Sequence, residues 1–249
     1  MPGELPLRPA PCAPLLALLL LISRPAAAHA AAPPSWLTQC ADCPQNQLFL
    51  GDQNLRLDSQ GRPSLAYGGD EVYYAHHDGT AWQVEAVAEG SYWVGWWYQA
   101  PPALALDAQD EPHVVYLDGS GQQLVYAHRA GGGWPAEVID GTIYGYLNRT
   151  DTSLALDTAG VPHVAYQKQG ALMLATRSGS TWQIETVDGS AYSENHVSLA
   201  LDAGGAPHIG YFSVHDVDRC EMRYAQWVGG AWRVEVVDAV QYCLGESSS

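Results

Sequence analysis

Four copies of one sequence unit fill most of the chain, and this repeat limits the fold more than any other feature. The units begin with LRLDSQGRPSLAY at Leu55, LALDAQDEPHVVY at Leu104, LALDTAGVPHVAY at Leu154 and LALDAGGAPHIGY at Leu199. The aspartate of the unit recurs at intervals of 49, 50 and 45 residues. Each unit continues into a short apolar segment, a glycine-rich turn and a tryptophan followed three residues later by glutamate. A period of about 48 residues is typical of repeat architectures such as propellers.

Within one unit the pattern predicts four short β-strands separated by turns. In the third copy the expected strands cover residues 153–157, 162–166, 172–176 and 182–188. The first two are joined by Asp-x-x-Gly-x-Pro, in which glycine supplies a positive φ and proline starts the next strand. The 25 glycines and 16 prolines of the chain favour a turn-rich β-protein and exclude coiled coils and helical bundles. We therefore predict an all-β fold, a β-propeller with four recognisable four-stranded blades.

The repeat also sets the expected domain boundaries. The propeller repeats should cover residues 48–249, with blades at about 48–91, 92–143, 144–191 and 192–240 and a tail to Ser249. Two interpretations of the ring stay open. Either the four blades are part of a larger ring, since propellers have four to eight blades, or they close on themselves with residues 45–51 and the C-terminal tail at the seam.

The N-terminal residues have the pattern of a secretory signal peptide. Arg8 precedes an apolar run at residues 13–22, and the small-residue sequence Ala28-His29-Ala30 follows. The apolar run is too short to cross a bilayer, which needs about twenty residues. We therefore predict a signal peptide at residues 1–30, an N-terminal segment at 31–47, and a chain that is exported, extracellular or periplasmic, and not inserted in a membrane after cleavage.

The acidic charge narrows the classes of partner. The chain has 11 lysines and arginines against 27 aspartates and glutamates, a formal net charge of -16. Such a field repels phosphate backbones and anionic lipid headgroups, which argues against nucleic-acid binding. Glycans, extracellular proteins and cations remain as expected partners.

The variable loops give the candidate binding surface. In a four-stranded antiparallel blade, the loops after the second and fourth strands share one end, and rigid scaffolds often display function on loops. The loop at residues 92–98 is rich in tyrosine and tryptophan, which suit stacking on sugar rings or anchoring a protein. Packing between blades is the alternative role for these aromatic residues. The predicted ligand-binding residues are Trp93, Trp96, Trp97, Tyr98, Tyr146 and Arg149.

The repeated histidines and glutamates are expected to be structural. His113, His163 and His208 occupy one position in successive units, so they cannot converge on a single metal ion. We expect each to bond to the repeated aspartate or a backbone group within its own blade. The repeated glutamates receive the same interpretation: Glu85, Glu137, Glu185 and Glu235.

One acidic loop occurs in the fourth unit alone. Its residues His215, Asp216, Asp218 and Glu221 offer oxygen and imidazole ligands to Ca²⁺ or another divalent ion. A solvated loop without metal is the alternative. Apart from this calcium hypothesis, the sequence predicts no cofactor.

The predicted mature chain has four cysteines, an even number that indicates disulfides in an exported protein. We expect Cys220 to pair with Cys243 and Cys40 with Cys43, because the first two lie on loops at the same end of the fourth blade and the last two form a Cys-x-x-Cys. Cross-pairing between the two sets would instead join the ring seam.

The line SLALDxxGxPHVAY, followed by LxYAxxxGxxWxxExVD, resembles the blade repeat of secreted bacterial proteins grouped with sialidase-like or BNR-type propellers. Such families include glycosidases, lyases, lectins and adhesins, so the resemblance specifies a fold more than a function. Sialidase chemistry would need three arginines around a carboxylate, and no Phe/Tyr-Arg-Ile-Pro motif is present. We therefore expect a non-catalytic binding or adhesion module. The alternatives are a sialidase-like hydrolase or lyase, tested at Arg149 and Arg219, and a structural segment of a larger surface protein.

Overall fold

The structure is a computed structural model. It describes residues 41, 53–68, 71–88, 101–118, 123–141, 151–190, 196–216 and 219–241. The chain divides into two units, Met1–Gln39 and Cys40–Ser249, and all described residues belong to the second. The described residues include no helix with the length and apolar character that a membrane span requires.

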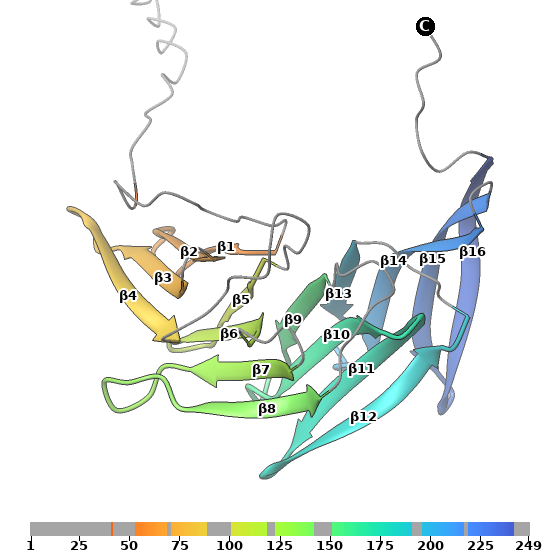
Figure 1. Cartoon of the computed structure of the whole chain (residues 1–249). Helices are drawn as coiled ribbons and strands as arrows, with labels where there is room; N and C mark the ends of the chain where they lie inside the picture. The colour runs from red at the N-terminus through yellow and green to blue at the C-terminus, as the bar shows by residue number, and fades with distance from the viewer. Residues whose placement is uncertain are drawn as a thin grey trace, which may run out of the picture. The chain divides into compact units, whose positions relative to one another are not determined.

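The described residues form sixteen strands in four antiparallel sheets of four strands each, and each sheet contains one copy of the repeat (Figure 1). Blade 1 consists of β1 (Leu55–Leu57), β2 (Pro63–Gly68), β3 (Val72–His77) and β4 (Trp82–Ala88). Blade 2 consists of β5 (Ala103–Leu106), β6 (Pro112–Leu117), β7 (Gln123–His128) and β8 (Ala136–Gly141). Blade 3 consists of β9 (Thr152–Leu156), β10 (Pro162–Lys168), β11 (Ala171–Ser178) and β12 (Thr181–Asp188). Blade 4 consists of β13 (Val197–Leu201), β14 (Pro207–Asp216), β15 (Arg219–Val228) and β16 (Ala231–Gln241).

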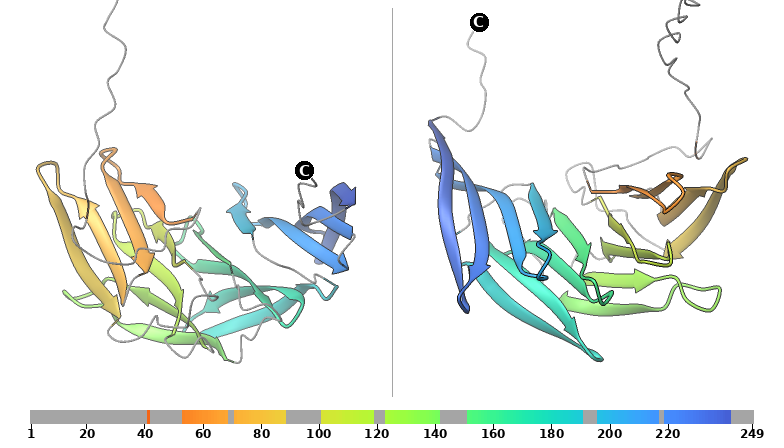
Figure 2. Two further views of the ribbon diagram at one scale, coloured as in Figure 1. Left: turned by 45° about the horizontal axis from the view of Figure 1, so that its top comes forward. Right: turned by 180° about the vertical axis from the view of Figure 1, so that it is seen from behind.

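The strand order within each sheet follows the sequence order, and the first strands of successive blades lie beside one another. Strand β9 contacts both β5 and β13, and β5 contacts β1 (Figure 2). This radial repetition of four-stranded meanders is a β-propeller, which confirms the predicted fold class. The four strands predicted for the third unit are found within two residues of their expected bounds.

The repeated aspartate holds the turn between the first two strands of every blade. In blade 3, Asp157 Oδ1 accepts hydrogen bonds from the amides of Ala159 and Val161, both at 2.8 Å. The backbone closes the same turn, because the amide of Asp157 donates to the carbonyl of Val161 at 3.0 Å. Proline can follow at the start of the second strand, where a ladder donor is not needed. The Asp-x-x-Gly-x-Pro line is therefore a turn signal.

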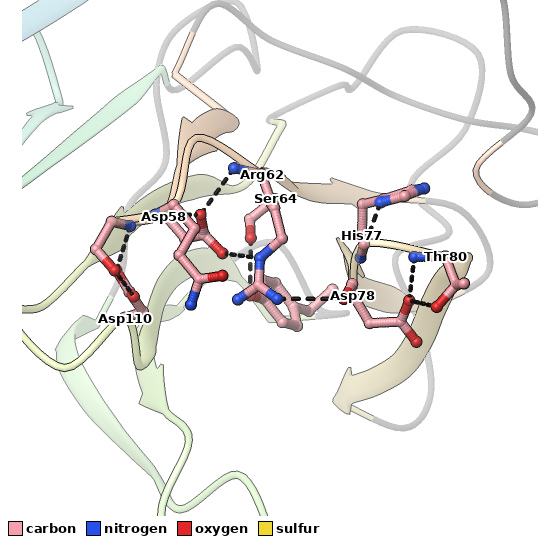
Figure 3. Close-up of polar contacts among 11 residues, drawn as sticks. Asp58, Arg62, Ser64, His77, Asp78, Thr80 and Asp110 are labelled. Atoms are coloured by element: carbon pink, nitrogen blue, oxygen red, sulfur yellow. Dashed lines mark hydrogen bonds and ion pairs between the residues drawn. The ribbon is translucent and has the colours of Figure 1, made fainter.

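Blade 1 extends this turn with an arginine, as Figure 3 shows. Asp58 Oδ2 accepts from Arg62 Nε at 2.6 Å, and Arg62 Nη1 donates to the carbonyl of Asp78 at 3.2 Å. Asp78 caps the next turn by accepting from the amide of Thr80 at 2.7 Å. Arg62 thus ties together the two turns at this end of the blade.

Glycine is needed in these turns because one residue has a positive φ. Gly61, Gly160 and Gly205 have φ values of 76°, 78° and 81°, and Asp110 takes the position in blade 2 with φ 64°. Aspartate tolerates this conformation better than most residues. Its carboxylate also accepts from the amide and hydroxyl of Ser59 in blade 1, at 2.8 and 2.6 Å (Figure 3).

The apolar core lies between the sheets, in three clusters that each join two successive blades. We call the face that packs on the following blade the leading face and the opposite face the trailing face. In the cluster between blades 3 and 4, Leu172, Leu174 and Val187 of the leading face pack against Leu199 and Ile209 of the trailing face. We number the contacts between blades 1 and 2, 2 and 3, and 3 and 4 as junctions 1, 2 and 3.

Candidate functional site

The loops after the second and fourth strands of each blade lie at one end of the sheets, which we call the loop face. The ligand-binding residues predicted from sequence, Trp93, Trp96, Trp97, Tyr98, Tyr146 and Arg149, lie outside the described residues. The described structure shows where their segments begin. The aromatic loop follows Ala88 at the end of β4 and precedes Ala103 at the start of β5, so it connects the two blades of junction 1.

A buried cluster of charged groups lies at the loop-face end of junction 3. The Arg223 guanidinium contacts Asp188 Oδ2 through Nη1 at 2.7 Å and Glu221 Oε2 through Nε and Nη2, both at 2.7 Å. The Tyr211 hydroxyl donates to the same Asp188 oxygen at 2.5 Å. The side chains of Arg223, Asp188 and Glu221 are only 12%, 9% and 1% exposed. Buried charges of this kind must be paired, and here one cation holds two carboxylates.

Junction 2 carries a simpler form of the same cluster. The Tyr166 hydroxyl donates to Asp140 Oδ2 at 2.7 Å, and Lys168 Nζ contacts both oxygens of that carboxylate at 2.7 and 2.8 Å. Asp140 and Tyr166 occupy the repeat positions of Asp188 and Tyr211. The cation comes from a different position, because Lys168 lies on the second strand whereas Arg223 lies on the third.

The described residues of junction 1 do not form such a charged cluster. Ala88 stands at the position of the two aspartates, Val125 at that of Arg223, and Tyr116 at that of the two tyrosines. No described residue accepts a hydrogen bond from the Tyr116 hydroxyl. Among the described residues junction 1 thus lacks a carboxylate paired with a cation at this end, and Asp118 stands there at the position of Lys168. The aromatic loop joins the two blades of this junction.

The environment of these groups shifts their pKa values. Burial and the adjacent Asp140 carboxylate raise the pKa of Tyr166, and burial with Asp188 does the same for Tyr211. Burial alone would raise the pKa of Asp188, but hydrogen bonds from Tyr211, Ser190 and Arg223 hold it below its ordinary value. Asp188 is therefore ionised at neutral pH.

This lowered pKa predicts an acid-sensitive junction. The unfolded chain binds a proton at Asp188 near pH 3.9 and the folded chain binds it at a lower pH, so the stabilisation is present above about pH 4 and is lost as pH falls. We expect Asp188→Asn to be less stable than wild type at pH 7 and to lose less stability between pH 5 and 2.5. Urea unfolding at several pH values measures both quantities, and two parallel pH curves would contradict the prediction.

The repeated histidines interact inside their own blades, as predicted, but the partner within hydrogen-bond distance is a side-chain hydroxyl and not the repeated aspartate or a backbone group. Nε2 of His113, His163 and His208 lies 3.6, 3.8 and 3.7 Å from the repeated aspartate of the same blade. The other ring nitrogen of His113 pairs with the Tyr126 hydroxyl, and that of His163 pairs with the Thr176 hydroxyl at 3.1 Å. Burial lowers the pKa of His113 and His163, which keeps their rings neutral at pH 7.

The repeated glutamates mostly link neighbouring blades. Glu85 pairs with Arg129 at 3.0 Å and Glu137 with Arg177 at 2.7 Å, each across a junction. At junction 3, Glu185 accepts from Trp232 Nε1 at 3.1 Å. Their role is structural, as expected, but the contacts of Glu85, Glu137 and Glu185 run to the next blade and not within their own blade, as the sequence interpretation had them.

The predicted metal loop is described in part. The backbones of His215 and Asp216 belong to β14, Asp218 lies outside the described residues, and Glu221 is the buried partner of Arg223. The part of the chain that the structure describes holds no group of three histidine, cysteine, aspartate or glutamate residues that could bind a metal ion. The calcium site stays a prediction.

Of the four predicted disulfide cysteines, Cys220 is the one that the structure describes. Its side chain is buried and disulfide-bonded. Cys243, its expected partner, and Cys40 with Cys43 lie outside the described residues, so the predicted pairing is not tested.

Sequence analysis did not identify the buried clusters of junctions 2 and 3. Their signal was an aspartate at the end of the fourth predicted strand in blades 2, 3 and 4, replaced by Ala88 in blade 1. The lysine and the arginine gave no such signal, because neither recurs at its position in the other units.

No protein-family model matches the chain, and no curated protein sequence matches it either. The resemblance to sialidase-like or BNR-type repeats therefore stays an expectation. Solved structures are similar in fold. The protein AofleA from Arthrobotrys oligospora is 10% identical with a TM-score of 0.53, over 72% of this chain and 55% of that chain.

Two further structures have related arrangements. A variant of the Aleuria aurantia lectin in complex with α-methyl-L-fucoside is 15% identical with a TM-score of 0.52, over 74% of this chain and 59% of that chain. A polysaccharide lyase, an ulvan lyase bound to a saccharide, is 12% identical with a TM-score of 0.50, over 75% and 55%. The chain thus matches little more than half the length of these proteins. At such identities the likeness shows a shared fold.

Proposed function

We propose that this chain is an exported, non-catalytic module that binds neutral glycans through its loop face, at the aromatic loop of junction 1. The observation that carries the proposal is the difference between the three junctions. Junctions 2 and 3 fill the loop-face end with paired charges, whereas junction 1 presents Ala88, Val125 and Tyr116 where the aromatic loop starts. A sugar ring needs a flat apolar platform with a few polar groups, and tyrosine and tryptophan supply both.

The net charge supports a neutral ligand. At a formal charge of -16 the chain repels sugars that carry carboxylate or sulfate groups, unless a cluster of basic residues faces them. The described basic residues of the loop-face clusters, Lys168 and Arg223, are already paired with carboxylates. Of the solved structures similar in fold, the lectin is in complex with the neutral α-methyl-L-fucoside, whereas the ulvan lyase is bound to a saccharide that contains GlcA, so the preference for a neutral ligand rests on the charge of this chain.

The buried carboxylates favour binding over hydrolysis. A general acid must carry a proton at the working pH, which requires a raised pKa. Asp188 instead has a lowered pKa, and Glu221 is held against Arg223. The alternative hydrolase or lyase function would therefore depend on residues outside these clusters, and we expect no turnover of the glycans that bind.

The test is a glycan array that contains neutral and acidic glycans, followed by titration of the best neutral glycan. We expect Trp96→Ala and Trp97→Ala each to weaken binding about fivefold or more, because loss of an aromatic contact costs more than about 1 kcal/mol and 1.4 kcal/mol is tenfold. Trp227→Ala is the control, since Trp227 is an exposed tryptophan near the end of β15 that is opposite the loop face.

Three results would contradict the proposal. Equal affinity of wild type and both loop variants for the glycan would show that Trp96 and Trp97 do not stack on the sugar. Selective binding of acidic glycans would contradict the neutral ligand. Release of new sugar ends during incubation with a bound glycan would show catalysis, which the alternative function predicts.

A further inference from the structure

We propose that two copies of this chain associate head to tail, with the leading face of blade 4 in each copy covered by the trailing face of blade 1 in the other. The proposal is independent of glycan binding. It starts from a difference in exposure between the two outermost faces and the six faces inside the three junctions.

The leading face of blade 4 is exposed at positions that are buried in every other blade. Val237 is 65% exposed, whereas its repeat equivalents Val87, Ile139 and Val187 are 7%, 5% and 6% exposed. Met222 is 45% exposed, whereas its equivalent Leu172 is fully buried against blade 4. These side chains are aliphatic, like those that the three junctions bury. The leading face of blade 4 is therefore as apolar as a face inside a junction, but no described neighbouring blade covers these side chains.

The trailing face of blade 1 shows the same contrast. Leu55 is 54% exposed, whereas Leu104, Leu154 and Leu199 at the same repeat position are 0%, 2% and 7% exposed. Leu57, two residues further along β1, is 63% exposed. Exposed apolar side chains gathered on one face indicate an interaction surface.

The two exposed faces are complementary, because inside the molecule the same kind of leading face packs on the same kind of trailing face. At every junction, a leading face with aliphatic residues at the Met222 and Val237 positions packs on a trailing face with leucine at the Leu55 position. The leading face of blade 4 therefore fits a trailing face, and among the described residues the trailing face of blade 1 exposes Leu55 and Leu57 along β1.

Polar groups add to the fit. Asp238 is exposed on blade 4, at the position of Asp140 and Asp188, which accept hydrogen bonds across junctions 2 and 3. Glu235, at the position of the glutamates that cross each junction, is 45% exposed. In blade 1, His77 stands at the repeat position of Arg129 and Arg177, which form ion pairs with glutamates across junctions 1 and 2.

A second copy satisfies both exposed faces at once. Each copy has one exposed leading and one exposed trailing face, so two copies can form two identical junctions and present eight blades together. Eight blades lie within the usual propeller range of four to eight. Head-to-tail contacts that close in this way produce a ring, whereas contacts that do not close produce a filament.

The experiment measures the mass of the purified full chain in solution by sedimentation equilibrium. We expect the wild-type chain to have twice the mass of one copy. Val237→Glu places a charge on the leading face of blade 4, and Leu55→Glu places one on the trailing face of blade 1. Each variant alone should shift the protein to the mass of one copy, with a circular dichroism spectrum like that of wild type.

Val138→Glu is the matched control. Val138 is 49% exposed on the outer strand β8 of blade 2, away from both outermost faces, so the variant should keep the doubled mass. A wild-type chain with the mass of one copy would overturn the proposal. So would a dimer that resists both charged variants, or one that is lost in one variant and kept in the other, because a head-to-tail contact needs both faces.

Discussion

Arg223→Met is expected to destabilise the folded chain by about 3–5 kcal/mol at pH 7, the cost of removing one partner from a buried ion pair. The variant leaves the Asp188 and Glu221 carboxylates, 9% and 1% exposed, without the guanidinium that contacts both. Methionine fills a similar length without a donor. Urea unfolding of both proteins at pH 7 measures the difference.

The pH dependence separates the loss of the ion pair from the loss of packing. Below about pH 4 wild type loses the stabilisation that comes from the lowered pKa of Asp188, so the difference in stability between wild type and Arg223→Met should shrink as pH falls. A difference that stays constant with pH would indicate that the arginine acts through its aliphatic stem alone.

Arg233→Met provides the control for the arginine prediction. Arg233 contacts Glu235 at 2.9 Å in the same strand, but the two side chains are 67% and 45% exposed. Exposed pairs contribute about 0–1 kcal/mol. If Arg233→Met and Arg223→Met were equally unstable, the burial of the junction 3 cluster would not explain its effect.

The strands and turns were predictable because the repeat samples each position four times. Asp157, for example, stands in a turn whose geometry depends on local hydrogen bonds to Ala159 and Val161, which the spacing within one unit reveals. The role of His113 was predictable for the same reason. Repetition alone does not decide whether a residue bonds within its own blade, because the repeated Glu85 and Glu137 pair with arginines of the next blade.

The charged clusters were not predictable from the repeat. Asp188 and Arg223 are 35 residues apart and belong to different blades, and they meet through the packing of two sheets. Arg223 replaces Met173, Val125 and Tyr73 of the other blades, so the repeat itself predicts an apolar or aromatic residue there. Residues that depart from the repeat thus distinguish one junction from another. Ala88 is a further example, because it stands at junction 1 where the other blades have aspartate.

The packing between blades predicts the second large effect on stability. Leu174→Ala should lower the free energy of unfolding by about 2–5 kcal/mol, because it removes a buried leucine side chain and leaves a cavity. Leu174 is 2% exposed on the leading face of blade 3, where it packs with Leu199 and Ile209 of blade 4. The measurement is urea unfolding followed by circular dichroism.

Ile184→Ala in the neighbouring strand β12 distinguishes a junction effect from a general loss of aliphatic side chains. Ile184 pairs with Ala175 in the same sheet and is 40% exposed, so its truncation removes less buried surface and should cost below about 1.5 kcal/mol. A similar loss in both variants would mean that the blade is stabilised mainly within its own sheet. A clearly larger loss for Leu174→Ala would show that each blade depends on the next one for stability, as stacked repeats do when a single unit cannot bury its apolar face alone.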